Sequence, residues 1–287
     1  MPPPRIILNS LALLVITGCS SPTYQATAGK PAANATMEMA AAPVTITTGD
    51  RFLYAEAPVG SGYPNSWTVL ENIGYESAYD ETFKNPAWVA YHLAPPAHVP
   101  PPRPSIGYPT DKRTQSKVTA ADFPKGYDHG HMAPNEAIAT FFSAAAQNET
   151  FLMSNMVAQR PGLNRGPWKS LETQEYSNWA KAHDVWIICG PVYTTADNQP
   201  IAPADRYGNK QVCIPIACFK IEMTTDGRGL HTLAFIMPQN VGTGHAPGEF
   251  LTSIREIEKR TGLNFFSSLP KTKQDEIEEK IATALWP

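Results

Sequence analysis

The stretch Tyr127-Asp128-His129-Gly130-His131-Met132-Ala133-Pro134 decides the fold and the chemistry predicted for this chain of 287 residues. Met153-Ser154-Asn155 follows it, and then Leu163-Asn164-Arg165-Gly166-Pro167-Trp168, with Leu171-Glu172 directly beyond. An imidazole that can take a proton, an amide oxygen that can hold a hard cation and a carboxylate therefore occur in one ordered segment. Such groups are typical of a hydrolytic site that works with a divalent cation.

Strands and helices alternate irregularly around this stretch. Apolar or β-branched runs predict strands over 87–93, 150–156, 185–192, 212–223 and 230–237. Helices are predicted over 135–147, over 167–183, after a capping box at Ser253–Glu256 as far as Gly262, and over 271–285. Adjacent strands with intervening helices favour an α+β fold with a mainly antiparallel sheet flanked by helices.

The N-terminus has the pattern of an export signal. A short positive start precedes the apolar run Ile6–Ile16, which is shorter than the roughly 20 residues of a permanent membrane helix. The sequence Ile16-Thr17-Gly18-Cys19 resembles the lipobox of bacterial lipoproteins. That resemblance implies a signal peptide over 1–18, lipidation of Cys19 and, because Ser20 follows, an outer-membrane lipoprotein of the cell envelope facing the periplasm or the exterior. An ordinary signal peptide cleaved elsewhere is the alternative.

Composition divides the remainder of the chain. Residues 19–48 are rich in Ala, Thr and Pro and show no hydrophobic period, so we expect a flexible tether there and one domain over 49–287. The net charge of −3 does not indicate a nucleic-acid binder, although a local basic groove is compatible with it.

Three cysteines remain besides Cys19, namely Cys189, Cys213 and Cys218. Because three is odd, at least one thiol stays free or pairs outside the chain.

The chemistry that suits these groups best is hydrolysis of a phosphodiester bond. The attacking water must lose a proton, and histidine is the usual base near neutral pH. A divalent cation can stabilise the charge that develops on the leaving oxygen. Mg²⁺ prefers oxygen ligands and keeps several waters, so one asparagine carbonyl suffices as its protein ligand.

Several ordered motifs resemble the DNA/RNA non-specific endonuclease family, the endonuclease G-like ββα-metal nucleases. The resemblance begins with Asp128-His129-Gly130-His131 and the downstream Asn155, Gln159, Asn164 and Glu172. It extends back to Trp88-Val89-Ala90-Tyr91 and forward to Ile188-Cys189-Gly190-Pro191-Val192-Tyr193, Ile214-Pro215 and the segment 257–266. It implies a ββα-metal catalytic motif and hydrolysis of DNA and RNA with little sequence preference. Both a monomer and a homodimer are compatible with it.

The resemblance assigns roles by position. His131 becomes the general base, and Asn164 the direct ligand of Mg²⁺, with Mn²⁺ as the alternative cation. Glu172 holds the water shell of the cation or the local geometry, and Asn155 supports the site from behind. An upstream arginine contacts phosphate in the family, for which Arg103 is the first candidate and Arg113 the second.

One position departs from the family pattern. His129 stands where the family usually has arginine, whose fixed charge and planar fork match phosphate. A histidine there could still donate one hydrogen bond to phosphate, and we expect activity to persist with a stronger dependence on pH. Asp128 is either a ligand or a structural hydrogen-bonding group.

Other interpretations stay open at this point. His129 and His131 could form a zinc pair, Glu172 could be a solvated residue of an amphipathic helix, and Asn155 could satisfy buried backbone. The fold could also have lost turnover and only bind nucleic acid at the cell envelope. A structural envelope lipoprotein is the remaining class.

Overall fold

A computed structural model describes residues 51–60, 67–194, 212–226 and 229–287. The predictions for the signal peptide, for lipidation at Cys19 and for the tether fall outside these residues. In the described part, no helix has both the length and the apolar character needed to cross a membrane.

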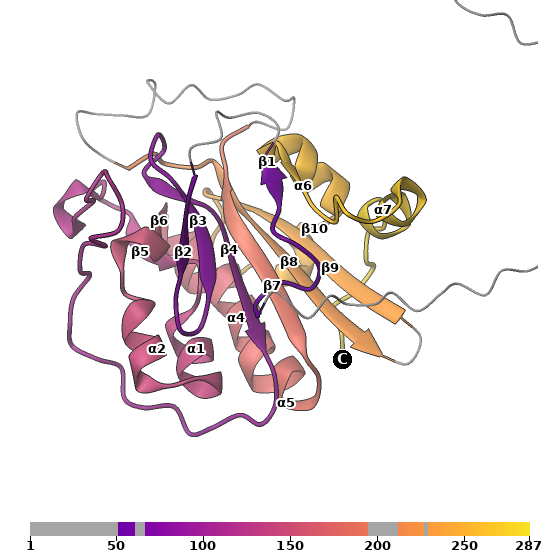
Figure 1. The fold of residues 1–287 in the computed structure, drawn as a ribbon, viewed down its shortest axis with the longest axis horizontal. Helices are drawn as coiled ribbons and strands as arrows, with labels where there is room; N and C mark the ends of the chain where they lie inside the picture. The colour runs from indigo at the N-terminus through magenta and orange to yellow at the C-terminus, as the bar shows by residue number, and fades with distance from the viewer. Residues whose placement is uncertain (1–50, 61–66, 195–211, 227–228) are drawn as a thin grey trace, which may run out of the picture. The chain divides into compact units, whose positions relative to one another are not determined.

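A seven-stranded sheet forms the centre of the described residues, in the order β10-β9-β8-β7-β4-β3-β2 (Figure 1). Every neighbouring pair in it is antiparallel, which confirms the predicted sheet type. Its strands are β2 (Trp67–Glu71), β3 (Glu76–Asp80), β4 (Asn85–Leu93), β7 (Val185–Val192), β8 (Ala217–Asp226), β9 (Gly229–Pro238) and β10 (Leu251–Thr252). A separate pair joins β1 (Val59–Gly60) to β11 (Leu263–Asn264).

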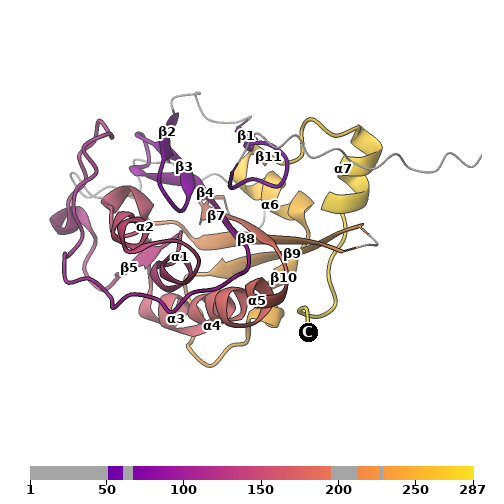
Figure 2. The same ribbon diagram turned by 60° about the horizontal axis from the view of Figure 1, so that its bottom comes forward.

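Helices cover both faces of the sheet, as Figure 2 shows. Alternation along β4 explains the two layers, because Val89 and Tyr91 face one core while Trp88 and Ala90 face the other. The first core is covered by α1 (Asn135–Phe141), α2 (Ala144–Glu149) and a long helical segment from Pro161 to Ala182. The second is covered by α6 (Ile254–Thr261), with α7 (Lys271–Glu278) packed beside it.

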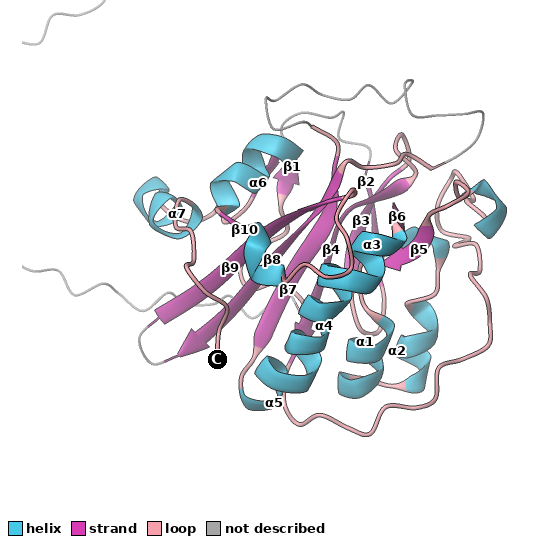
Figure 3. Ribbon diagram, turned by 180° about the vertical axis from the view of Figure 1, so that it is seen from behind, coloured by secondary structure: helices cyan, strands magenta, loops and turns pink. Residues whose placement is uncertain are grey.

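The long helical segment is interrupted twice (Figure 3). It consists of α3 (Pro161–Leu163), a π-helical turn η3 (Asn164–Trp168), α4 (Lys169–Gln174), a second π-helical turn η4 (Glu175–Trp179) and α5 (Ala180–Ala182). Gly166 leaves helical geometry at φ −104°, ψ −116°, directly before Pro167. Since proline cannot donate the next helical hydrogen bond, a kink forms there, and the helix starts earlier than the predicted 167.

A small hairpin carries the decisive stretch of sequence. Strand β5 (Asp128–His131) pairs antiparallel with β6 (Met156–Gln159), and the long helical segment begins two residues after β6. Two strands followed by a helix give the predicted ββα arrangement, with α1 and α2 inserted between the strands. Three short 3₁₀ turns complete the described elements: η1 (Ala120–Asp122), η2 (Met153–Asn155) and η6 (Pro247–Phe250).

Besides the start of the long helical segment, four predicted boundaries are wrong. The strand expected over 150–156 is a 3₁₀ turn followed by β6, because the buried Asn155 side chain bonds local backbone. The helix expected over 135–147 breaks at Phe142, and Ser143 caps a second helix by accepting from Ala146 N at 3.2 Å. The strand expected from 212 begins at Ala217.

The fourth wrong boundary is the end of the last helix, which stops at Glu278 rather than 285. The chain turns away there and packs Trp286 edge-on against Trp179, with ring centroids 5.0 Å apart. By contrast, the predicted N-cap of α6 is confirmed, since Ser253 Oγ accepts from Glu256 N at 3.1 Å. Gly262 ends that helix at φ 71°, as predicted.

Candidate active site

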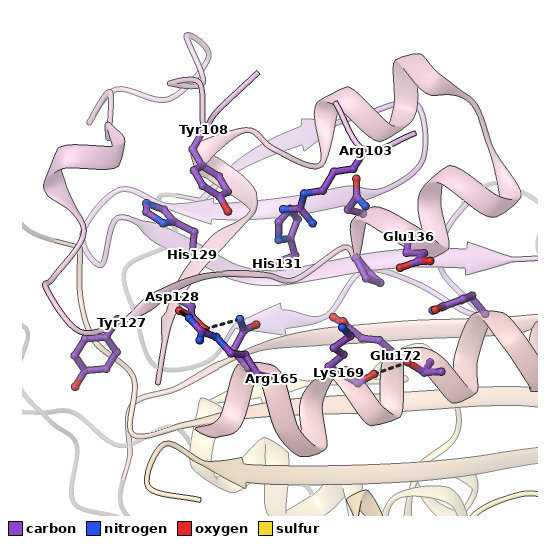
Figure 4. A pocket seen from close by; sticks show the side chains of 15 residues that line it. Arg103, Tyr108, Tyr127, Asp128, His129, His131, Glu136, Arg165, Lys169 and Glu172 are labelled. Atoms are coloured by element: carbon purple, nitrogen blue, oxygen red, sulfur yellow. Dashed lines mark hydrogen bonds and ion pairs between the residues drawn. The ribbon is translucent and has the colours of Figure 1, made fainter. Parts of the chain in front are cut away.

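A pocket of about 440 Å³ opens where β5, the start of α1, the long helical segment and the loop before Asp128 meet (Figure 4). It brings together His131, Asn164, Glu172, Arg103, Asp128 and His129, six of the residues singled out from sequence. Its full lining is Arg103, Tyr108, Tyr127, Asp128, His129, His131, Pro134, Asn135, Glu136, Asn164, Arg165, Lys169, Glu172, Thr173 and Tyr176.

Asn155 fixes the backbone that follows His131. Its side chain accepts from Ala133 N at 2.9 Å and donates to Ala133 O at 2.9 Å and to Thr150 O at 2.8 Å. Its own carbonyl accepts from Met132 N at 3.1 Å. The side chain is fully buried, and no part of it lines the pocket. Asn155 therefore supports the site from behind by satisfying buried backbone.

His131 presents a neutral imidazole to the pocket. Its Nε2 is covered by protein and has no hydrogen-bond partner among the described residues. The ring of Phe151 meets it edge-on at 5.2 Å. Burial, followed by the charge of Arg103, lowers the pKa of His131 to about 3. The ring is therefore unprotonated near pH 7, which is the form that can accept a proton.

Arg103 is the upstream arginine that reaches this site. Its guanidinium lies over the ring of Phe151, 4.9 Å from the centroid, and Figure 4 shows it directed toward His131. The second candidate, Arg113, does not line this pocket. Its guanidinium donates to both carboxylate oxygens of Asp111 and to Asn72 Oδ1 at 2.9 Å. Its charge is used to fix a loop rather than to meet a ligand.

Asp128 organises the neighbouring side chains. Its carboxylate accepts from Asn164 Nδ2 at 2.9 Å and from Arg165 Nε and Nη2 at 2.9 and 2.7 Å. Although burial raises the pKa of Asp128, these bonds lower it below its ordinary value. The carboxylate is thus ionised and acts as a hydrogen-bonding anchor, the structural role left open from sequence.

Asn164 is placed at the pocket by the first π-helical turn of the long helical segment. Its amide nitrogen is committed to Asp128, because a carboxylate can only accept. The amide oxygen is left as the acceptor available to a cation. This geometry fits the ligand role assigned to Asn164 by the resemblance.

Glu172 is half-buried and lines the pocket wall. Its Oε1 is covered and has no partner among the described residues. Burial raises the pKa of Glu172 to about 8, and the charge of Lys220 opposes that shift. A covered carboxyl oxygen that faces a pocket without a partner is suited to a ligand or its water shell.

His129 lies flat between two aromatic rings. The Tyr108 ring stacks on it at 4.2 Å and the Phe123 ring at 4.3 Å, with interplanar angles of 10° and 14°. Burial lowers the pKa of His129, and its Nε2 is covered and has no partner in the part of the chain that the structure describes. The ring therefore carries little charge near pH 7, and it fixes the loops around the pocket. It does not replace the fork of an arginine.

The zinc interpretation finds no support in this geometry. Across the described ranges, no three or more His, Cys, Asp or Glu side chains are grouped so that they could hold a metal ion. Cys189, Cys213 and Cys218 are all buried, and Cys189 and Cys218 are free thiols, in agreement with the odd count.

Sequence reasoning missed part of the pocket wall. The missed lining residues are Tyr108, Tyr127, Pro134, Asn135, Glu136, Thr173 and Tyr176. Asn135 and Glu136 had a local signal, since they follow Pro134 directly and occupy the first turn of α1. Asn135 Oδ1 is buried without a partner among the described residues. Tyr108 had no such signal, because a loop brings it to His129 from 21 positions upstream.

Comparison with known proteins agrees with this geometry. The sequence profile of the DNA/RNA non-specific endonuclease family matches residues 57–272. A mitochondrial nuclease EXOG of Danio rerio is 30% identical over 211 residues, which cover 70% of this chain and 61% of that protein. A nuclease of Serratia marcescens is 30% identical over 215 residues, covering 70% of this chain and 76% of the relative. Endonuclease G of Bos taurus is 27% identical, covering 72% of each.

A solved structure shares the fold. The crystal structure of an EndoG/EndoGI complex superposes with a TM-score of 0.59 at 23% identity, over 73% of this chain and 90% of the other. The profile match spans most of the chain, and its range includes the six predicted residues that meet in the pocket. The chain belongs to the DNA/RNA non-specific endonuclease family.

Proposed function

We propose that this protein is a metal-dependent endonuclease that hydrolyses phosphodiester bonds of DNA and RNA with little sequence preference. The observation that carries the proposal is the shared pocket of His131 and Asn164. One residue offers an unprotonated imidazole and the other an amide oxygen, and both face the same space. The names of the relatives, nuclease and endonuclease G, support the same activity.

His131 is the proposed general base. Its covered Nε2 has no competing partner among the described residues, so it can take the proton of a water molecule that enters with the substrate. The Asn155 side chain holds the backbone at Ala133, just beyond His131, through two hydrogen bonds. Arg103 lies next to the ring and can meet the negative charge of the phosphate.

The residues present fit a magnesium ion, with manganese as an alternative. Asn164 would hold the ion through its amide oxygen, and Glu172 would accept hydrogen bonds from its waters. Both contribute oxygen donors, which hard cations prefer, and the pocket has no sulfur donor in its lining. When bound, such an ion supplies charge stabilisation for the leaving oxygen. The Asp128 carboxylate fixes the orientation of the Asn164 amide by accepting its hydrogen bond.

Weak sequence preference fits the character of the pocket lining. Arg103, Arg165 and Lys169 supply three positive side chains that can meet phosphate, and phosphate contacts carry no base information. Binding should therefore weaken as salt rises. Replacing Arg165 or Lys169 by glutamine should each reduce the slope of log affinity against log salt by roughly one unit.

The direct test is digestion of plasmid DNA and of RNA by the purified domain starting near Val44, with and without magnesium. His131→Ala should lower kcat by roughly a hundredfold to ten-thousandfold. His245→Ala is the matched control, since that exposed histidine pairs with Glu249 and is outside the pocket lining. Full activity in His131→Ala would end the assignment of the base.

The same assay separates the second candidate function, a catalytically inactive protein that only binds nucleic acid. Such a protein would shift DNA in a gel without cutting it under any metal condition. His131 Nε2 and Glu172 Oε1 have no partner within the described ranges, and such polar atoms in a pocket favour the active form.

We also propose attachment to the bacterial cell envelope through lipid at Cys19, with the outer membrane as the destination. The lipobox-like sequence Ile16-Thr17-Gly18-Cys19 and the following Ser20 support this. Mass spectrometry of the protein from bacterial membranes should show acyl chains on residue 19. Cys19→Ala should release the protein from the membrane fraction, and retention there would contradict the proposal.

A further inference from the structure

One end of the pocket is bordered by an arginine that is not part of its lining. Tyr127 lines the pocket, and Arg160 lies over its ring, with the guanidinium carbon 5.4 Å from the ring centroid. Figure 4 shows Tyr127 at the end of the lining that is opposite Glu136 and Glu172. Because Arg160 is exposed, it can meet a ligand that leaves the pocket over Tyr127.

The contact between these two side chains follows from the hairpin. Asp128 pairs with Gln159 at the end of the β5–β6 ladder. Tyr127 and Arg160 are the next residues beyond that pair, one on each strand, and cross-strand neighbours lie within reach of each other's side chains. The backbone at Arg160 is also fixed, since its N–H donates to Gln239 Oε1 at 2.8 Å. The hairpin that supplies the proposed base therefore also determines where this guanidinium lies.

The charge of Arg160 is not taken up by a carboxylate. Arg165, which lines the pocket, pairs with Asp128 at 2.7 Å, whereas Arg160 pairs with no Asp or Glu side chain in the described ranges. A tyrosine ring attracts a guanidinium through its π-face and leaves the N–H donors at the edge of the guanidinium available. Arg160 is thus held in place while it keeps the charge and the planar fork that match a phosphate.

The two ends of the pocket differ in charge. At one end, the exposed carboxylate of Glu136 opposes the positive charge of Lys169 in the same lining. At the other end, Lys125 precedes Tyr127 by two residues, and like Arg160 it is exposed and pairs with no carboxylate that the structure describes. Since a polyanion is attracted to excess positive charge, a nucleic-acid strand is favoured to leave the pocket over Tyr127.

We propose that Arg160, held on the Tyr127 ring, binds a phosphate of the nucleic-acid strand next to the phosphodiester that is cut. Tyr127 is a positioning residue that acts through Arg160. The inference rests on the proposed function, because it takes nucleic acid as the ligand of the pocket. It adds a subsite that only a substrate longer than a dinucleotide can reach.

The test compares two substrates of the purified full-length chain. One is a dinucleotide, which has a single phosphodiester, and the other is a single-stranded DNA of about twelve nucleotides. Arg160→Gln should lower the ratio of kcat/KM for the longer strand to kcat/KM for the dinucleotide by roughly two- to fivefold, mainly through KM. Arg160→Lys should recover part of that ratio, because the charge remains without the planar fork.

Lys181→Gln is the matched control for the loss of one exposed positive charge. Lys181 is exposed, lies on α5 outside the pocket lining and pairs with no carboxylate among the residues that the structure describes. Its variant should keep the wild-type ratio. An equal ratio in Arg160→Gln and in Lys181→Gln would overturn the subsite.

A double-mutant cycle tests the role of Tyr127. Tyr127→Leu should lower the same ratio, and adding Arg160→Gln to it should lower the ratio little further, because the two side chains act as one unit. Effects that multiply fully would overturn the positioning role and would mean that Tyr127 meets the strand by itself.

Binding of the labelled longer strand without metal separates this inference from the proposed function. Arg160→Gln should reduce the slope of log affinity against log salt by roughly one unit relative to Lys181→Gln. If the dinucleotide is cut too slowly to measure, this slope decides. A reduced slope in a chain that cuts nothing would remove the nuclease function and keep the subsite. Equal slopes in an active enzyme would remove the subsite alone.

Discussion

The amide nitrogen of Asn164 donates to the Asp128 carboxylate, with Nδ2 and Oδ2 2.9 Å apart. The two residues come from different elements, β5 and the first π-helical turn of the long helical segment, so the bond also ties the hairpin to the helix. Because the carboxylate fixes which amide atom faces it, the oxygen of Asn164 is presented to the other side. One ionised residue therefore determines the orientation of the proposed cation ligand.

Asp128→Asn should weaken cation binding. The new amide can still accept one hydrogen bond, but it cannot hold Asn164 and Arg165 together, so the Asn164 amide loses its fixed orientation. We expect the magnesium concentration for half-maximal rate to rise by roughly ten- to a hundredfold. Arg165→Gln is the control, because it leaves the bond between Asp128 and Asn164 in place. A larger magnesium effect in Arg165→Gln than in Asp128→Asn would contradict this reading.

Asn155→Ala should destabilise the fold. The substitution leaves Ala133 N, Ala133 O and Thr150 O without the partners that the Asn155 side chain provides. We expect a loss of about 3 kcal/mol or more in the free energy of unfolding, measured by urea titration, because each of the three buried unsatisfied groups costs about 1–3 kcal/mol. Asn178→Ala, at an exposed helix position, should change it by less than about 0.5 kcal/mol. Comparable losses in the two variants would exclude the structural role.

His129→Phe tests whether the histidine is a stacked ring or a phosphate contact. The new ring can occupy the space between Tyr108 and Phe123, so the melting temperature should stay close to that of the wild type. Because burial lowers the pKa of His129, its loss should also leave the shape of the rate profile between about pH 6 and 8 unchanged. If the rate depends less on pH in His129→Phe than in the wild type, the phosphate contact expected from sequence is supported.

Much of the fold could be predicted because its signals are local. The N-cap Ser253 and the left-handed Gly262 bound α6 as expected. The apolar run over 185–192 is β7 at the predicted residues. The helix before it was predicted too short, because Pro167 normally starts a helix, whereas here a kink at Gly166 joins it to α3.

The site was predictable only where its motif is contiguous or its spacing is fixed. Asp128 and His131 share a strand, and Asn164 and Glu172 share one helical segment, so their meeting followed from the ββα order. Lys220 could not be found in this way. It is a single lysine in an apolar strand, and its partner Glu175 comes from the helical segment packed on the sheet.

Glu278→Gln should remove a loss of stability that the wild type shows as pH rises, at the contact between α7 and α6. Glu278 has a side chain that is 0% exposed, and it lies beside Arg255, with Nη2 and Oε2 2.6 Å apart. Burial, followed by the charge of Glu258, raises the pKa of Glu278 to about 7, above its ordinary value of 4.5. An acid whose pKa is raised by folding stabilises the fold fully below the unfolded value, and that stability is lost as pH rises through the folded value.

The melting temperature of the wild type should therefore fall relative to that of Glu278→Gln between about pH 5 and pH 8, because glutamine stays neutral throughout. The two proteins should be nearly equally stable at the acidic end. Glu276→Gln is the control, since its carboxylate is exposed and pairs with Lys273 on the same helix. A wild type that gains stability over Glu278→Gln as pH rises would mean that Arg255 outweighs burial, and that this contact is held by an ion pair rather than by a protonated acid.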